Sequence, residues 1–228
     1  MLVAFGASHI GPSHKLDRLP NQDAFRVCQS HKGVCVAVAD GLGSRPFSHI
    51  GSKAAIGLVR DLFQSTKELH HSQVAPWLSK NWKAAFNDKF DAYETTCLWA
   101  WVDEYGNGVA GQIGDGLLLI RSEGRFHVLT PESANFGNQT QTLSHESAVQ
   151  VSTNIRISIP GDGVLLITDG IADDLMPDQL EYFFDAIYQK QSRLNKRQMK
   201  RWLKREMEQW STPLHGDDKT IAGIFRVE

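Results

Sequence analysis

Cysteine is scarce in this chain of 228 residues, which contains only Cys28, Cys35 and Cys97. An odd number of cysteines without Cys-x-x-Cys spacing indicates neither a disulfide framework nor a zinc site. None of the nine histidines forms a His-x-x-x-His pair with a suitable third ligand. Any metal site in this protein is therefore expected to rely on oxygen ligands.

Long apolar runs are also missing. No stretch approaches the ~18 apolar residues that a membrane-spanning helix requires, and no basic and then apolar leader opens the sequence. The net charge of −2 argues against nucleic-acid binding by bulk electrostatics. Internal repeats and low-complexity linkers are absent as well. We therefore expect a cytoplasmic monomer with no membrane span and no nucleic-acid partner, built as one domain over residues 1–228.

Hydrophobic periodicity predicts strands and helices in alternating blocks. The predicted strands are residues 2–7, 24–28, 34–39, 96–102, 108–113, 117–120, 126–129, 155–159, 164–168 and 220–227. The predicted helices are residues 52–63, 75–90, 177–191 and 195–210, with Pro76 in a first turn. This order favours a four-layer α-β-β-α sandwich, an α/β (α+β) fold of two mostly antiparallel sheets flanked by helix pairs.

Aspartates recur where predicted strands end. They lie in the segments Asn21-Gln22-Asp23, Asp40-Gly41, Gly114-Asp115-Gly116, Thr168-Asp169-Gly170 and Asp217-Asp218. An isolated buried charge costs several kcal/mol or more, and several carboxylates in one place repel one another unless a cation holds them. Carboxylates and water are the ligands that Mg²⁺ and Mn²⁺ prefer. The pattern therefore predicts a two-metal site with oxygen ligands from distant parts of the chain.

These motifs, in this order, carry a family resemblance. The chain resembles the metal-dependent (type 2C) protein serine/threonine phosphatases over nearly its whole length. Five elements are similar to the family's "R..NED.F", "DG.GG", "GDSR", "SDG" and "DN.T": Arg18 with Asn21-Gln22-Asp23, Asp40-Gly41-Leu42-Gly43-Ser44, Gly114-Asp115-Gly116, Thr168-Asp169-Gly170 and Asp217-Asp218-Lys219-Thr220. Residues 11–14 and 133–140 further resemble a bacterial branch of the family.

The resemblance implies roles for individual residues. Asp23 and Asp40 would bind and bridge two Mg²⁺ or Mn²⁺ ions, with the carbonyl oxygen of Gly41 as a further ligand. Asp169 would complete one metal site, and Asp115 together with Asp169 would offer a third, looser site.

Two questions about these residues stay open. Either Asp217 or Asp218 can be the last ligand, and alignment on Thr220 favours Asp217, with Asp218 behind it or capping. Arg18 would hold the substrate phosphate through its planar guanidinium, and His14 could approach the substrate.

The implied reaction is hydrolysis of phosphoserine and phosphothreonine by a metal-bridging water or hydroxide. The partner would be a phosphorylated protein, either a target of a serine/threonine kinase or the kinase itself. Gln22 and Leu42 depart from the family pattern, which has a glutamate and, in some members, a histidine at these positions. The alternatives are a pseudophosphatase that binds or regulates without turnover, and a two-metal hydrolase of small phosphate esters. Retention of every metal aspartate favours an active enzyme.

One segment, residues 190–205, is strongly basic. Its apolar residues Met199, Trp202 and Leu203 have helical spacing, which predicts an amphipathic helix with a solvated basic face. A docking surface for an acidic phosphoprotein or for anionic lipid is the alternative.

Overall fold

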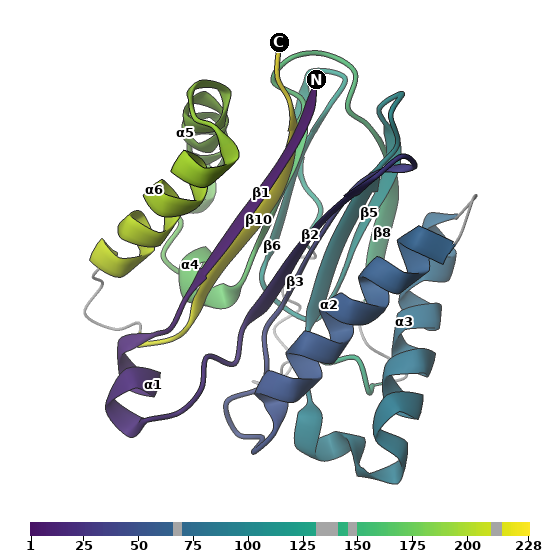
Figure 1. The fold of residues 1–228 in the computed structure, drawn as a ribbon, viewed down its shortest axis with the longest axis vertical. Helices are drawn as coiled ribbons and strands as arrows, with labels where there is room; N and C mark the ends of the chain where they lie inside the picture. Colours follow the sequence, from purple (N-terminus) through teal and green to yellow (C-terminus); the bar gives the residue numbers. More distant parts are fainter. Residues whose placement is uncertain (66–69, 131–140, 146–149, 211–215) are drawn as a thin grey trace.

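The computed structural model describes residues 1–65, 70–130, 141–145, 150–210 and 216–228. Two five-stranded sheets stack face to face, and helices cover both outer faces (Figure 1). Every strand pairing is antiparallel. The predicted four-layer α-β-β-α sandwich is confirmed.

The first sheet joins the two ends of the described chain. Its strand order is β1-β10-β9-β6-β7, with β1 at Leu2–His9, β10 at Lys219–Arg226, β9 at Gly163–Ile167, β6 at Leu117–Ser122 and β7 at Arg125–Val128. Strands β1 and β10 pair along their whole length, from Leu2 opposite Arg226 to His9 opposite Lys219. The termini therefore lie side by side at one end of the sandwich (Figure 1).

The second sheet has the order β2-β3-β4-β5-β8. Its strands are Ala24–Ser30, Gly33–Ala39, Cys97–Val102, Asn107–Ile113 and Gln150–Arg156. Side chains of β3 alternate between two environments, because successive residues of a strand point to opposite faces. Val36 and Val38 pack against the first sheet. Ala37 and Ala39 face the helices outside, and both faces of this strand are therefore buried.

The helices form the two outer layers. On the second sheet lie α2 (Ser48–Ser65) and α3 (His71–Phe86), followed by the 3₁₀ helix η1 (Asn87–Tyr93). On the first sheet lie α5 (Leu180–Arg193) and α6 (Lys196–Gln209). The short helices are α1 (Pro12–Asp17), α4 (Asp169–Ala172) and η2 (Pro177–Gln179). No helix in the described ranges is long and apolar enough to cross a membrane.

Three local predictions were wrong. Helix α3 begins at His71 rather than at residue 75, because His70 and Gln73 form a capping box, and Pro76 lies inside the helix instead of in its first turn. Strand β8 ends at Arg156, whereas a strand was predicted over 155–159. There the buried Asp162 carboxylate accepts hydrogen bonds from the backbone N–H groups of Ser158 and Ile159, which holds a turn instead.

Candidate metal centre

Aspartates from both sheets meet at the end of the sandwich opposite the termini. Asp23 directly precedes β2 and Asp40 directly follows β3, and the register places Ala24 opposite Ala39. Asp169 follows β9 and Asp217 precedes β10, two strands paired from Ile221 opposite Ile167 onward. Each pair of aspartates therefore flanks one antiparallel strand pair, and the stacking of the sheets brings the two pairs together.

A cavity of about 140 Å³ opens between these strand ends. The predicted site residues His14, Asp40, Gly41, Asp115, Asp169 and Asp217 line it, together with Gln22, Leu42, Gly43 and Thr96. Asp23 and Asp218 are buried behind it, with side chains 4% and 1% exposed. The structure thus gathers predicted site residues from five separate segments of the chain around one cavity.

Burial makes this cluster of carboxylates electrostatically unfavourable without a cation. Desolvation raises the pKa of Asp23 to about 8, and the charges of Asp218 and Asp169 contribute to the rise. The pKa of Asp40 is raised well above its ordinary value by burial and then by the charges of Asp23 and Asp169. Raised pKa values of neighbouring carboxylates are typical of a site that binds positive charge.

Two buried oxygen atoms support the same interpretation. Oδ1 of Asp23 and Oδ1 of Asp169 have no hydrogen-bond partner among the described residues. A buried oxygen that accepts no hydrogen bond carries a desolvation penalty that a cation would remove. The donor set is composed of carboxylates and a backbone carbonyl, as Mg²⁺ and Mn²⁺ prefer. The residues present therefore fit a divalent-metal site.

Threonines that the sequence analysis did not single out hold the Asp40 turn. The hydroxyl of Thr95 donates to the Asp40 carbonyl oxygen (2.7 Å), and the Asp40 N–H donates to Oγ1 of Thr96 (3.1 Å). A Cβ atom at Gly41 would lie 2.7 Å from the carbonyl oxygen of Ser48, so the start of α2 packs too closely for any other residue.

A third threonine, Thr168, supports Asp23 directly. Its Oγ1 donates to Oδ2 of Asp23 at 2.9 Å and accepts the N–H of Thr220 at 3.0 Å. Thr168 lies in the Thr-Asp-Gly motif, but its contact with Asp23 depends on how the sheets stack. No pattern in the sequence indicated that contact.

The neighbours Asp217 and Asp218 occupy different environments. Asp217 is exposed on the cavity wall, whereas Asp218 is buried. Oδ1 of Asp218 accepts the N–H of Gly11 (2.7 Å), and Oδ2 accepts the N–H of Gln22 (2.6 Å). Because both oxygens already bind backbone groups of the N-terminal segment, Asp218 is suited to hold that segment in place.

The two N-terminal candidates, His14 and Arg18, are placed differently. His14 is on α1 and lines the cavity, with Nδ1 2.9 Å from Oδ2 of Asp218 and the side chain 13% exposed. Arg18 ends α1 in a left-handed conformation (φ 56°), is exposed, and is not among the residues that line the cavity. Residues 133–140, which contributed to the resemblance to a bacterial branch, lie outside the described residues.

A family comparison agrees with this geometry. The family model described as protein phosphatase 2C matches residues 10–208. This chain belongs to that family. The curated proteins contain no match to the chain.

Solved structures of bacterial phosphatases have the same fold. The catalytic domain of the serine/threonine protein phosphatase PstP, in complex with two manganese ions, is 16% identical, with a TM-score of 0.69 over 100% of this chain and 99% of that one. PppA, a regulatory component of the T6SS in Pseudomonas aeruginosa, is 16% identical, with a TM-score of 0.70 over 98% and 97%. RsbX in complex with magnesium is 19% identical, with a TM-score of 0.63 over 98% and 94%.

Proposed function

We propose that this protein is an active phosphatase that hydrolyses phosphoserine and phosphothreonine in proteins and depends on Mg²⁺ or Mn²⁺. The observation that carries the proposal is the set of four carboxylates, Asp23, Asp40, Asp169 and Asp217, brought together from four strand ends at one cavity. A pseudophosphatase would have no use for this concentration of like charge, which is unfavourable without a cation.

The ligand set follows from the positions of these residues. Asp40, Asp169 and Asp217 present carboxylates to the cavity and Gly41 lies on its wall, while Asp115 extends the set toward a third ion. Two divalent ions in this site would lower the pKa of a water molecule and neutralise phosphoryl charge. Asp23, whose Oδ2 is fixed by Thr168, would add its unpartnered Oδ1 as a ligand from the buried side, and Asp218 keeps the N-terminal segment at the cavity.

His14 and Arg18 are assigned to the substrate. His14 faces the cavity from α1, where its ring can contact a phosphate or the peptide that carries it. Arg18 is at the exposed end of the same helix, and its guanidinium can extend to a phosphoryl group with two parallel hydrogen bonds. In this assignment the two residues orient the phosphate while the carboxylates hold the ions.

The charge of α6 favours a protein substrate over a small ester. All six cations of this helix are exposed, and within the described ranges only Arg205 has a carboxylate within ion-pair distance, Glu206 at 3.6 Å. Burial lowers the pKa of His9, and the charges of Lys15 and Lys204 act in the same direction while Glu208 opposes them, so cations of α1 and α6 lie near the same residue. An acidic stretch next to the phosphorylated residue would complement this surface.

Metal dependence tests the proposal. The purified protein, stripped with a chelator, should not hydrolyse a phosphothreonine peptide, and Mn²⁺ or Mg²⁺ should restore turnover. Asp169→Ala should remain inactive with metal, whereas Glu104→Ala, a change in the exposed β4–β5 turn, should behave like the wild type. Turnover that survives exhaustive chelation would contradict a metal mechanism. A metal-loaded protein that turns over no phosphopeptide would instead be a pseudophosphatase.

A further inference from the structure

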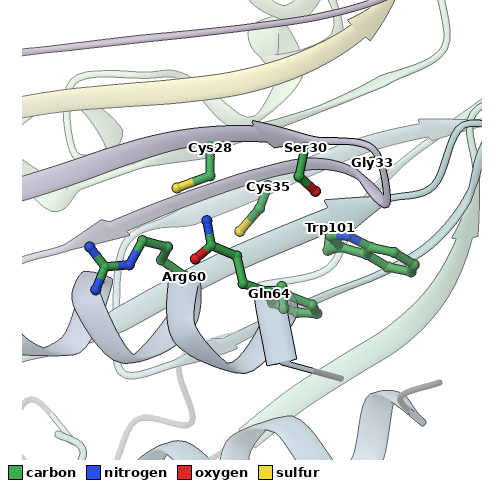
Figure 2. Close-up of a pocket in the computed structure, with 8 residues that line it drawn as sticks. Cys28, Ser30, Gly33, Cys35, Arg60, Gln64 and Trp101 are labelled. Atoms are coloured by element: carbon green, nitrogen blue, oxygen red, sulfur yellow. The ribbon is translucent and has the colours of Figure 1, made fainter. Parts of the chain in front are cut away.

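The β2–β3 hairpin carries two cysteines in directly opposed positions. In the antiparallel register Cys28 pairs with Cys35, and both side chains point toward α2 (Figure 2). Both thiols line a narrow cavity of about 10 Å³ together with Arg60 and Trp101. Cysteine spacing in the sequence did not suggest this pair, because the two residues meet only through the hairpin.

We propose that Cys28 and Cys35 are a site of oxidative modification, at which hydrogen peroxide converts the two thiols into a cross-strand disulfide. Opposed residues of an antiparallel pair have Cα atoms about 4.5–5.5 Å apart. Disulfides span Cα distances of roughly 4.4–6.8 Å, so the opposed Cα atoms are within range. Opposed Cβ atoms are about 4.5–5.5 Å apart, against roughly 3.5–4.5 Å in a disulfide, so a small approach of the two strands must accompany rotation of the side chains. The cavity is too small for a bulky disulfide such as oxidised glutathione, whereas peroxide can reach Cys28 from solvent because that residue is partly exposed.

The reaction proceeds in two steps. Cys28 is partly exposed and reacts first: its thiolate attacks a peroxide oxygen, the O–O bond breaks, and a sulfenic acid and one water form. Cys35, which is 5% exposed, then attacks the Cys28 sulfur, and the sulfenic hydroxyl leaves with the Cys35 proton as a second water. Two thiols lose two electrons to one peroxide.

Burial raises the pKa of Cys28, and Arg26 and Arg60 oppose the rise, so oxidation should accelerate with increasing pH.

The position of the pair gives the disulfide a structural consequence. Cys28 is five residues after Asp23, and Cys35 is five residues before Asp40. The cross-link would therefore join the middle of the two strands that present these aspartates. Covalent closure reduces the conformational entropy of the unfolded chain, so the oxidised protein should be more stable. This inference does not rest on the proposed function, since thiols are counted without any turnover.

Thiol counting and peptide mapping test the site. Folded wild-type protein treated with peroxide should lose two hydrogens in mass, retain one of its three thiols, and yield a Cys28–Cys35 linked peptide that dithiothreitol cleaves. Cys97→Ala should oxidise like the wild type, because Cys97 is fully buried. Cys28→Ser and Cys35→Ala should each prevent the mass loss. The melting temperature of oxidised wild type should exceed that of the reduced protein by roughly 5 °C.

Several outcomes would overturn the proposal. A disulfide that includes Cys97, a disulfide between two chains, or a gain of oxygen atoms on Cys28 without a cross-link would each show that the pair does not react as proposed. An unchanged or lower melting temperature of the cross-linked protein would show that the disulfide does not stabilise the hairpin. If Cys97→Ala fails to fold, the peptide map of the wild type still decides which thiols are joined.

Discussion

The strand-end aspartates and the N-terminal segment with α1 reach the same cavity by different means. Register fixes the aspartates: Asp23 and Asp40 flank one paired strand end, and Asp169 and Asp217 flank another. Segment 11–22 has no strand pairing and is held by single contacts, such as the N–H groups of Gly11 and Gln22 on Asp218. Sheet geometry therefore positions the proposed ligands, whereas isolated hydrogen bonds, two of them to Asp218 and one from the Ser13 N–H to the Gly216 carbonyl oxygen, position the segment assigned to the substrate.

The largest effect should come from the register-fixed aspartates. Asp40→Ala and Asp169→Ala should each lower kcat roughly a thousandfold or more, because they remove charge that holds the metal ions. The melting temperature of the metal-free protein should stay the same or rise, since like charges are removed. Steady-state kinetics on a phosphopeptide and thermal melts without metal measure the two effects. An Asp40→Ala enzyme with near-normal kcat/KM would remove Asp40 from the catalytic site.

Separate substitutions of the adjacent Asp217 and Asp218 distinguish a residue that binds metal from one that anchors the N-terminal segment. Asp217→Ala should reduce kcat roughly a hundredfold with little change in the metal-free melting temperature. Asp218→Ala should cost about 3 kcal/mol of folding free energy, since two buried N–H groups lose a charged acceptor, and should lower that melting temperature by roughly 6–12 °C. Asp218→Asn should recover part of this loss. The opposite pattern, with Asp217 the more destabilising change, would reverse the two assignments.

The same contrast explains what the sequence could predict. Alternating apolar residues followed by Asp-Gly identify strand ends, so the sandwich and the candidate aspartates were predictable. The anchoring role of Asp218 was not, because its partners are more than 190 residues away in the chain. Helix α1 was missed as well: it has no buried residue, and Pro12 at its start is not followed by the apolar stripe that indicates a helix.

Arg18 tests whether the α1 segment contributes to substrate binding. Arg18→Ala should raise KM with a smaller fall in kcat, and kcat/KM should fall about ten- to a hundredfold, since a bidentate phosphate contact is worth roughly 1.5–3 kcal/mol. Lysine should recover only part of the loss. Arg18→Gly should match alanine in kinetics but be more stable by about 1 kcal/mol, because Arg18 has a left-handed φ of 56°. Unchanged kinetics in all three variants would make His14 the next candidate for the phosphate contact.

The smallest effect should come from α6, which lies outside the cavity. Lys200→Glu with Lys204→Glu should lower kcat/KM about three- to tenfold for a phosphopeptide with an acidic flank, because the attraction acts through exposed, partly screened charges. A small phosphate ester should be hydrolysed at the wild-type rate, since the ions and their ligands are untouched.

Raising the salt concentration should lower the wild-type rate on the acidic peptide toward that of the variant. Lys80→Glu with Arg125→Glu, at exposed positions on α3 and β7, lowers the net charge by the same amount and serves as the control. Equal loss on both substrates would indicate damage to the fold. Unchanged kinetics together with lost binding to anionic vesicles would assign the basic face to lipid.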